Sequence, residues 1–280
     1  MQAFSEFKNM SASFWSLIKY VSETLGYTIR NQGVVRTYSI DEIDSLLSQN
    51  GIAVDYEIIE LAKQYFDMRA DLLNTVVRDN LMTAAEAKES FERLYPLYRD
   101  NNFKCKLPMN KQKGDMKQVA FFTAIINIIA EDVLRHSSVY DGSLGFNDDP
   151  RGLAYVFDDS NHIIGASSRR FDGAYPNILN PRIVWEIKEY YYATTFGSRV
   201  ADGVYETQLD GYEFRDISQR SGKSITHVFF LDAYKTWWED GKSYLCRIID
   251  ILNSGLVDEV IVGREVFHRW PELLSSIIEE

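Results

Sequence analysis

Cysteine is scarce in this sequence. Cys105 and Cys246 are the only two cysteines among 280 residues, and they lie far apart. A disulfide framework needs several paired cysteines, and a thiolate metal site needs closely spaced ones, so neither is indicated. The four histidines also lack the spacing of metal ligands. These absences favour a reduced, cytoplasmic protein whose chemistry does not depend on thiolates.

Other signatures are missing as well. The longest apolar stretch, around residues 119–130, is interrupted by Thr and Asn, so we expect no membrane span. Residues 1–10 are polar and carry Glu6 and Lys8, unlike a secretory signal. No phosphate-binding loop occurs, which argues against a nucleotide cofactor. No Gly-x-Ser-x-Gly elbow or Cys/His pairing indicates acyl transfer.

Positive charge is in short supply, because the chain carries a formal net charge of −11. This is unfavourable for contact with nucleic-acid phosphates, which are bound by Lys and Arg. The distribution of charge matters more than its sum. Residues 103–117 hold five lysines against one acid, and several arginines fall within residues 169–199. A solvated charge run remains an alternative explanation for the lysines.

The first part of the chain is predicted to be helical. Apolar residues recur at helical spacing in segments 11–25, 39–47, 53–80 and 83–98. Ser39 with Glu42, and Thr83 with Glu86, form two capping-box patterns. We predict a helical domain over residues 1–110. Its role is either reading of duplex DNA by a helix-turn-helix-like unit or scaffolding and oligomerisation, and its acidic faces weigh against the first.

Residues 111–280 are predicted to form a second domain of α/β class. A very apolar helix at 115–136 is followed by strands at 152–157, 162–171 and 182–189. A helix at 202–220, a strand at 225–231, a helix at 241–253 and a strand at 257–262 complete the pattern. Helices interleaved with strands predict a mixed central sheet flanked by helices.

The segment 169–212 concentrates the residues capable of chemistry. Within its strand, alternation places Glu186 and Lys188 on one face and Ile187 on the other. Asp172, Glu186 and the backbone carbonyl of Ile187 supply the oxygen ligands that Mg²⁺ prefers. Lys188 would orient or deprotonate an attacking water, or balance charge in the transition state. The alternative is an exposed charge pair, with Asp172 merely opening a turn at Gly173.

These residues resemble the signature of the PD-(D/E)XK nuclease superfamily, in which an Asp precedes (Asp/Glu)-x-Lys on the next strand. Asp172 and Glu186-Ile187-Lys188 match it, although Phe171 stands where the family often has proline. Gln208 and Tyr212 fit the Gln-x-x-x-Tyr element of its RecB-like and Cas4-like branch. The resemblance spans about residues 115–262.

The resemblance implies a restriction endonuclease-like core preceded by the helical domain. It implies catalysis by Asp172, Glu186 and Lys188, with Mg²⁺, or Mn²⁺ in its place, held by Asp172, Glu186 and the Ile187 carbonyl. Glu131 is a further candidate metal ligand. The candidate DNA-binding or supporting residues are Lys111, Lys113, Arg169, Arg170, Thr194, Thr195, Ser198, Arg199, Gln208 and Tyr212.

The expected activity is a metal-dependent endodeoxyribonuclease resembling type II restriction enzymes. It would act on duplex DNA and form a homodimer, because paired cuts need two sites. One alternative is a RecB-like nuclease that acts on DNA ends or flaps in phage defence or repair. Another is a non-catalytic nucleic-acid-binding or assembly protein built on a nuclease-derived fold.

Overall fold

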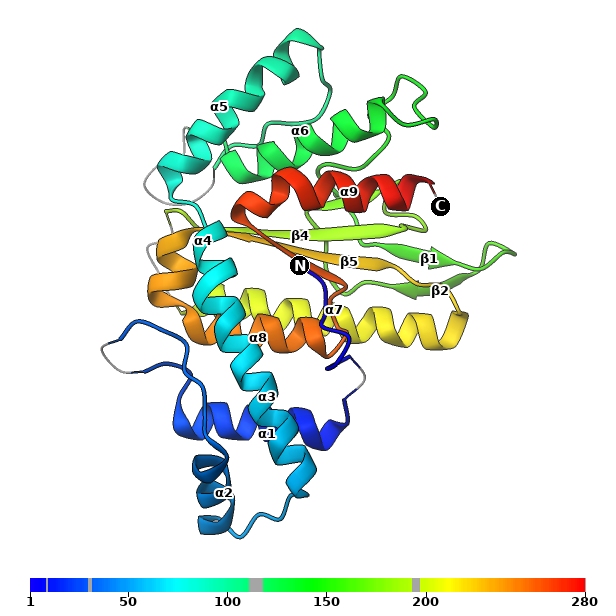
Figure 1. Ribbon diagram of the computed structural model, residues 1–280. Helices are drawn as coiled ribbons and strands as arrows, with labels where there is room; N and C mark the ends of the chain where they lie inside the picture. The colour runs from blue at the N-terminus through cyan, green and yellow to red at the C-terminus, as the bar shows by residue number, and fades with distance from the viewer. Residues whose placement is uncertain (9, 30–31, 111–117, 193–196, 280) are drawn as a thin grey trace.

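A four-stranded mixed β-sheet with helices on both faces forms the centre of the molecule, and further helices precede it (Figure 1). This arrangement, seen in a computed structural model, confirms the predicted fold class. The structure describes residues 1–8, 10–29, 32–110, 118–192 and 197–279. Within these residues, no helix combines the length and the apolar character needed to cross a lipid bilayer.

The main sheet has the strand order β3-β4-β5-β6. Its strands are β3 (Gly173–Tyr175), β4 (Ile183–Glu189), β5 (Thr226–Asp232) and β6 (Glu259–Val262). β3 runs antiparallel to β4, whereas β4, β5 and β6 are mutually parallel. A separate hairpin pairs β1 (Tyr155–Phe157) with β2 (Ile163–Ala166). The central strands are rich in apolar residues because both of their faces are covered.

One face of the sheet packs against α6 (Phe121–Arg135) and α9 (Val266–Glu279), with α5 (Ala84–Asp100) outside α6 (Figure 1). Trp185 and Phe230 project to this side and contact Trp270. The centroid of the Trp270 ring lies 5.2 Å from that of Trp185 and 5.1 Å from that of Phe230. The opposite face packs against α7 (Ser198–Ser221) and α8 (Lys242–Asn253). On β4 this second face carries Val184, Glu186 and Lys188, which therefore lie beneath α7.

The N-terminal helices form their own apolar core. They are α1 (Ala12–Leu25), α2 (Ile40–Gln49) and α3 (Tyr56–Leu72), and a π-helical turn (Leu73–Val77) leads from α3 into α4 (Arg78–Asn80). Both predicted capping boxes are present, at the starts of α2 and α5. Arg69 on α3 is fully buried and bonds Asp250 on α8, with Nη1 3.0 Å from Oδ1. This buried ion pair links the N-terminal helices to α8, which covers one face of the sheet.

Several boundaries differ from the sequence prediction. The helix predicted from residue 115 begins at Phe121, and the helix predicted from residue 202 begins at Ser198. The strand predicted over 162–171 ends at Ala166, and β3 begins directly after Asp172. The boundary predicted at residue 110 stays a prediction. In the structure α5 packs on α6, so residues 1–110 contribute to more than one core.

Gly173 explains why β3 is hard to see in the sequence. Glycine is unfavourable in strands, so the segment lacks a strand signal. Here Trp185 lies across the ladder from Gly173, and a Cβ at Gly173 would sit 2.0 Å from Trp185 Cε2. The aromatic ring occupies the space of the missing side chain.

Replacing Gly173 by alanine should therefore destabilise the fold. Overpacking a filled core costs about 1–3 kcal/mol, and the Trp185 ring has no flexible end that could move aside. Chemical denaturation would measure the loss. Gly152→Ala is the matched control, since its Cβ would meet only the tip of Ile178 at 3.0 Å. Equal stabilities for the two variants would contradict this account of β3.

Candidate functional site

Two carboxylates face each other at the end of the β3–β4 ladder. Gly173 pairs with Trp185, so the next step of the register places Asp172 opposite Glu186. The Asp172 N–H donates to the Trp185 carbonyl at 3.0 Å, and Asp172 Oδ2 accepts from the Ile187 N–H at 2.7 Å. Like charges directly opposite in a sheet are unfavourable. The pairing therefore depends on nearby cations to offset the repulsion.

Two cations compensate Glu186, which is only 4% exposed. Lys188 Nζ donates to Glu186 Oε1, and it lies 3.2 Å from Glu206 Oε2. Arg169 approaches from the other side, with Nη2 3.0 Å from Glu186 Oε2. The structure thus brings together all three predicted catalytic residues. It also places Arg169, predicted to support DNA binding, in direct contact with them.

Two further carboxylates come from α7 and were missed in the sequence. Arg169 Nε donates to both oxygens of Asp210, at 3.1 and 3.0 Å, and Glu206 contacts Lys188. Asp210 is fully buried. Their spacing of four residues puts both on the side of α7 that faces β4. The sequence held one signal for Asp210. It lies at helical spacing from Gly203 and Phe214, so it falls on the face of the helix that is expected to be buried, where an acid is unusual.

The environment shifts the acid–base properties of this cluster. Loss of hydration and repulsion from Glu186 raise the pKa of Asp172 to about 7, against the opposing effects of the Ile187 N–H, Lys188 and Arg169. Asp172 is exposed, so water moderates the first effect while the repulsion remains. Burial raises the pKa of Asp210 to about 6, although Arg169 opposes this. Asp172 is therefore suited to exchange a proton near neutral pH.

Lys188 stays charged. Burial lowers the pKa of its ammonium group, but Glu186 outweighs burial and the pKa lies above its usual range. Gly203 on α7 makes room for the lysine, since a Cβ there would lie 3.1 Å from Lys188 Cε. The lysine is thus held as a cation between β4 and α7.

The donor set fits a hard divalent cation. Glu186 Oε2 is buried and lies 3.0 Å from Arg169 Nη2, so a metal ion would share this oxygen with the guanidinium. The N–H of Ile187 points to the Asp172 edge of β4, and in an extended strand the carbonyl of the same residue points to the same edge. Two carboxylates and a carbonyl suit Mg²⁺, which keeps several waters. Across the described residues, no group of three or more His, Cys, Asp or Glu side chains is arranged to hold a metal ion.

The N-terminus of α7 lies near this cluster. Gly197 precedes the helix with φ 124°, and among the described residues no side chain caps the first turn. Ser198 and Arg199 are exposed on that turn, and Arg170 is exposed beside Arg169. Uncapped N–H groups at a helix N-terminus favour phosphate. The predicted residues Lys111, Lys113, Thr194 and Thr195 lie outside the residues that the structure describes.

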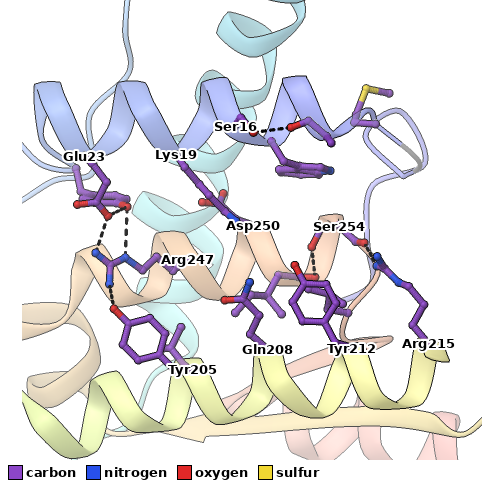
Figure 2. Close-up of a pocket in the computed structure, with 17 residues that line it drawn as sticks. Ser16, Lys19, Glu23, Tyr205, Gln208, Tyr212, Arg215, Arg247, Asp250 and Ser254 are labelled. Carbon is purple, nitrogen blue, oxygen red and sulfur yellow. Dashed lines mark hydrogen bonds and ion pairs between the residues drawn. The ribbon is translucent and has the colours of Figure 1, made fainter. Parts of the chain in front are cut away.

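Gln208 and Tyr212 share one helical face, but they point away from the carboxylate cluster. Both side chains line a pocket between α7, α8 and α1 (Figure 2). Glu206 and Asp210 occupy the opposite side of the same helix. The structure therefore does not bring the Gln-x-x-x-Tyr element to Asp172, Glu186 and Lys188.

Glu131 has a structural role in place of the predicted metal ligation. It is fully buried in α6, and its carboxylate accepts from the backbone N–H groups of Lys104 and Cys105, at 2.7 Å from each. Arg135 neutralises it at 2.7 Å. These contacts satisfy both oxygens and hold the turn after α5, so Glu131 is not part of the Asp172–Glu186 cluster.

Comparison with known proteins identified two family matches. Residues 82–277 match a family described as a domain of unknown function (DUF7687), and residues 1–76 match another domain of unknown function (DUF7690). The searches of curated proteins and of solved structures found no match.

The raised pKa of Asp172 predicts that the protein loses stability as the pH rises. In the unfolded chain an aspartate ionises near pH 3.9, whereas in the fold Asp172 does so at about 7. Stability is therefore lost as pH rises through this window. Asp172→Asn removes the cost while its amide oxygen still accepts from Ile187. Relative to wild type, its melting temperature should be higher at pH 8 and similar at pH 4.

Asp71→Asn, at an exposed position of α3, is the control for general charge effects and should show no such pH dependence. A constant difference between Asp172→Asn and wild type from pH 4 to 8 would contradict the raised pKa of Asp172, which burial and the repulsion from Glu186 produce.

Proposed function

The chain belongs to the DUF7687 family, and we propose from the geometry of its own residues that it is a metal-dependent nuclease that hydrolyses DNA phosphodiester bonds. One observation carries the proposal. Asp172 and Glu186 stand opposite each other at the end of a ladder, and Lys188 contacts Glu186. This cluster gathers carboxylates that repel one another beside a buried cation. Such perturbed groups are concentrated at functional sites.

Each residue has a role in this proposal. Asp172, Glu186 and the Ile187 carbonyl would hold Mg²⁺, with Mn²⁺ as a substitute. When bound, the ion would supply a Lewis acid and lower the pKa of a bound water. Lys188 would orient the attacking water and balance the charge that develops on the phosphate. Arg169 is a positioning residue, since it joins Glu186 to Asp210.

The first turn of α7 would bind the backbone of the substrate. Its backbone N–H groups, with Ser198 and Arg199, lie on the same helix as Glu206, which contacts Lys188. Arg170 adds a second exposed cation close to Asp172 in the sequence. Duplex DNA is the substrate that we propose, and two copies of the chain would supply the two sites needed for paired cuts.

The other nuclease hypothesis, action on DNA ends or flaps, depended on Gln208 and Tyr212. These residues face the separate pocket, so we place endonuclease action first.

A non-catalytic nucleic-acid-binding or assembly role is the second candidate function. It is favoured by the ion pairs that already engage Lys188 and Arg169.

Cleavage assays test the proposal. The full chain should cut supercoiled plasmid in the presence of Mg²⁺ and not in EDTA. Lys188→Met should lower the rate by about 10²-fold or more, the usual range for loss of a group that acts on a proton or charge in the transition state. Lys242→Met is the matched control, because Lys242 is a half-buried lysine on α8 that lies outside the cluster.

The substrates separate the hypotheses. Defined cuts in circular DNA would support the endonuclease, whereas loss of linear DNA alone would support end-directed action. If wild-type protein binds DNA but cuts neither form with Mg²⁺ or Mn²⁺, the proposal is wrong and the non-catalytic role remains.

A further inference from the structure

A second site lies on the other side of α7. It is a pocket of about 580 Å³ with α1 on one wall and α7 and α8 on the other (Figure 2). This volume is within the ~300–1,000 Å³ of small-molecule sites. The pocket lies between the segments that match the two families, and the proposed nuclease chemistry does not use it.

The pocket carries an excess of positive charge. Its lining includes three cations, Lys19, Arg215 and Arg247, and two carboxylates, Glu23 and Asp250. Both carboxylates are already neutralised. Glu23 Oε1 lies 2.6 Å from Arg247 Nη2, and Asp250 is held by Arg69 behind the wall.

Lys19 and Arg215 are left without a carboxylate partner among the ion pairs of the described chain. Lys19 extends from α1 into the pocket (Figure 2). Arg215 donates to the Ser254 carbonyl at 2.6 Å, and its guanidinium lies over the Tyr212 ring, 5.8 Å from the ring centroid. Both side chains are exposed and charged, and their position on the walls of one cavity favours an anionic ligand.

Aromatic and amide groups share the cavity with these cations. Trp15, Tyr205, Gln208 and Tyr212 contribute to the walls. Tyr205 and Tyr212 are 55% and 49% exposed, although large aromatic side chains are usually buried. Exposed rings offer surfaces for stacking on a planar group. The Gln208 amide carries both donors and an acceptor, which suits the edge of a nucleobase.

From this combination we propose that the pocket binds a nucleotide. Lys19 and Arg215 bind its phosphate, the rings of Trp15 and Tyr212 bind its base, and Gln208 contacts the base edge. The recognition is by side chains, so it needs no phosphate-binding loop. The ligand would act as an effector separate from the DNA substrate.

Helix α7 connects the pocket to the carboxylate cluster, so a bound ligand can affect the cluster without reaching it. Tyr205, Gln208 and Tyr212 alternate along α7 with Glu206 and Asp210, which contact Lys188 and Arg169. A nucleotide that shifts or orders this part of α7 would change those contacts. This effect rests on the proposed nuclease function, whereas nucleotide binding does not.

Calorimetric titration of the full chain with AMP, GMP, CMP and UMP tests the binding directly. At least one of these should bind with a Kd below about 1 mM, at least tenfold more tightly than inorganic phosphate or the matching nucleoside. Tyr212→Ala should weaken that binding by about tenfold, and Lys19→Ala should weaken it by about two- to fivefold. The matched controls Tyr56→Ala and Lys88→Ala, exposed and outside the pocket, should not.

Circular dichroism would verify that the variants are folded. Binding by no mononucleotide, binding unaffected by both pocket variants, or phosphate alone binding as tightly as the nucleotide would each overturn the proposal. Because calorimetry does not require DNA cleavage, its result stands whether or not the chain is a nuclease. A change in cleavage rate on addition of the bound nucleotide would then test the coupling through α7.

Discussion

The repulsion between Asp172 and Glu186 is the constraint that organises the centre of this protein. The β3–β4 register holds the two carboxylates opposite each other, and two nearby cations, Lys188 and Arg169, offset their repulsion. Lys188 and Arg169 are in turn balanced by Glu206 and Asp210 of α7. Removing Lys188 or Arg169 would leave carboxylates unpaired in a poorly solvated place, which is costly. The six residues therefore form one electrostatic unit.

The same unit determines how α7 is built. Its side toward β4 must admit Lys188, which Gly203 allows, and must carry acids at positions 206 and 210. Farther along, Gly211 lets the helix approach the segment before β6, where a Cβ would lie 2.2 Å from the Leu256 carbonyl oxygen. The remaining side of the helix is left to Tyr205, Gln208 and Tyr212. One helix thus connects two different chemical environments.

Local patterns in the sequence predicted much of the fold. The two capping boxes and the β-branched residues of β4 act over a few residues, so their outcome could be foreseen. Strand alternation likewise placed Glu186 and Lys188 on one face. β3 was missed because it begins with a glycine, and only the contact with Trp185, a residue distant in the sequence, explains why a glycine is needed there. Gln208 and Tyr212 share a helical face as expected, but the direction of that face depends on close packing at Gly203 and Gly211.

The central claim is that Asp172 and Glu186 together hold a divalent cation. Diffraction from crystals of the protein soaked in Mn²⁺, recorded near the manganese absorption edge, would test it most directly. The account predicts an anomalous peak within coordinating distance of both carboxylates and of the Ile187 carbonyl, about 2.0–2.2 Å from each oxygen for an ion of this type. Ordered manganese elsewhere in the crystal, with no peak between Asp172 and Glu186, would contradict it.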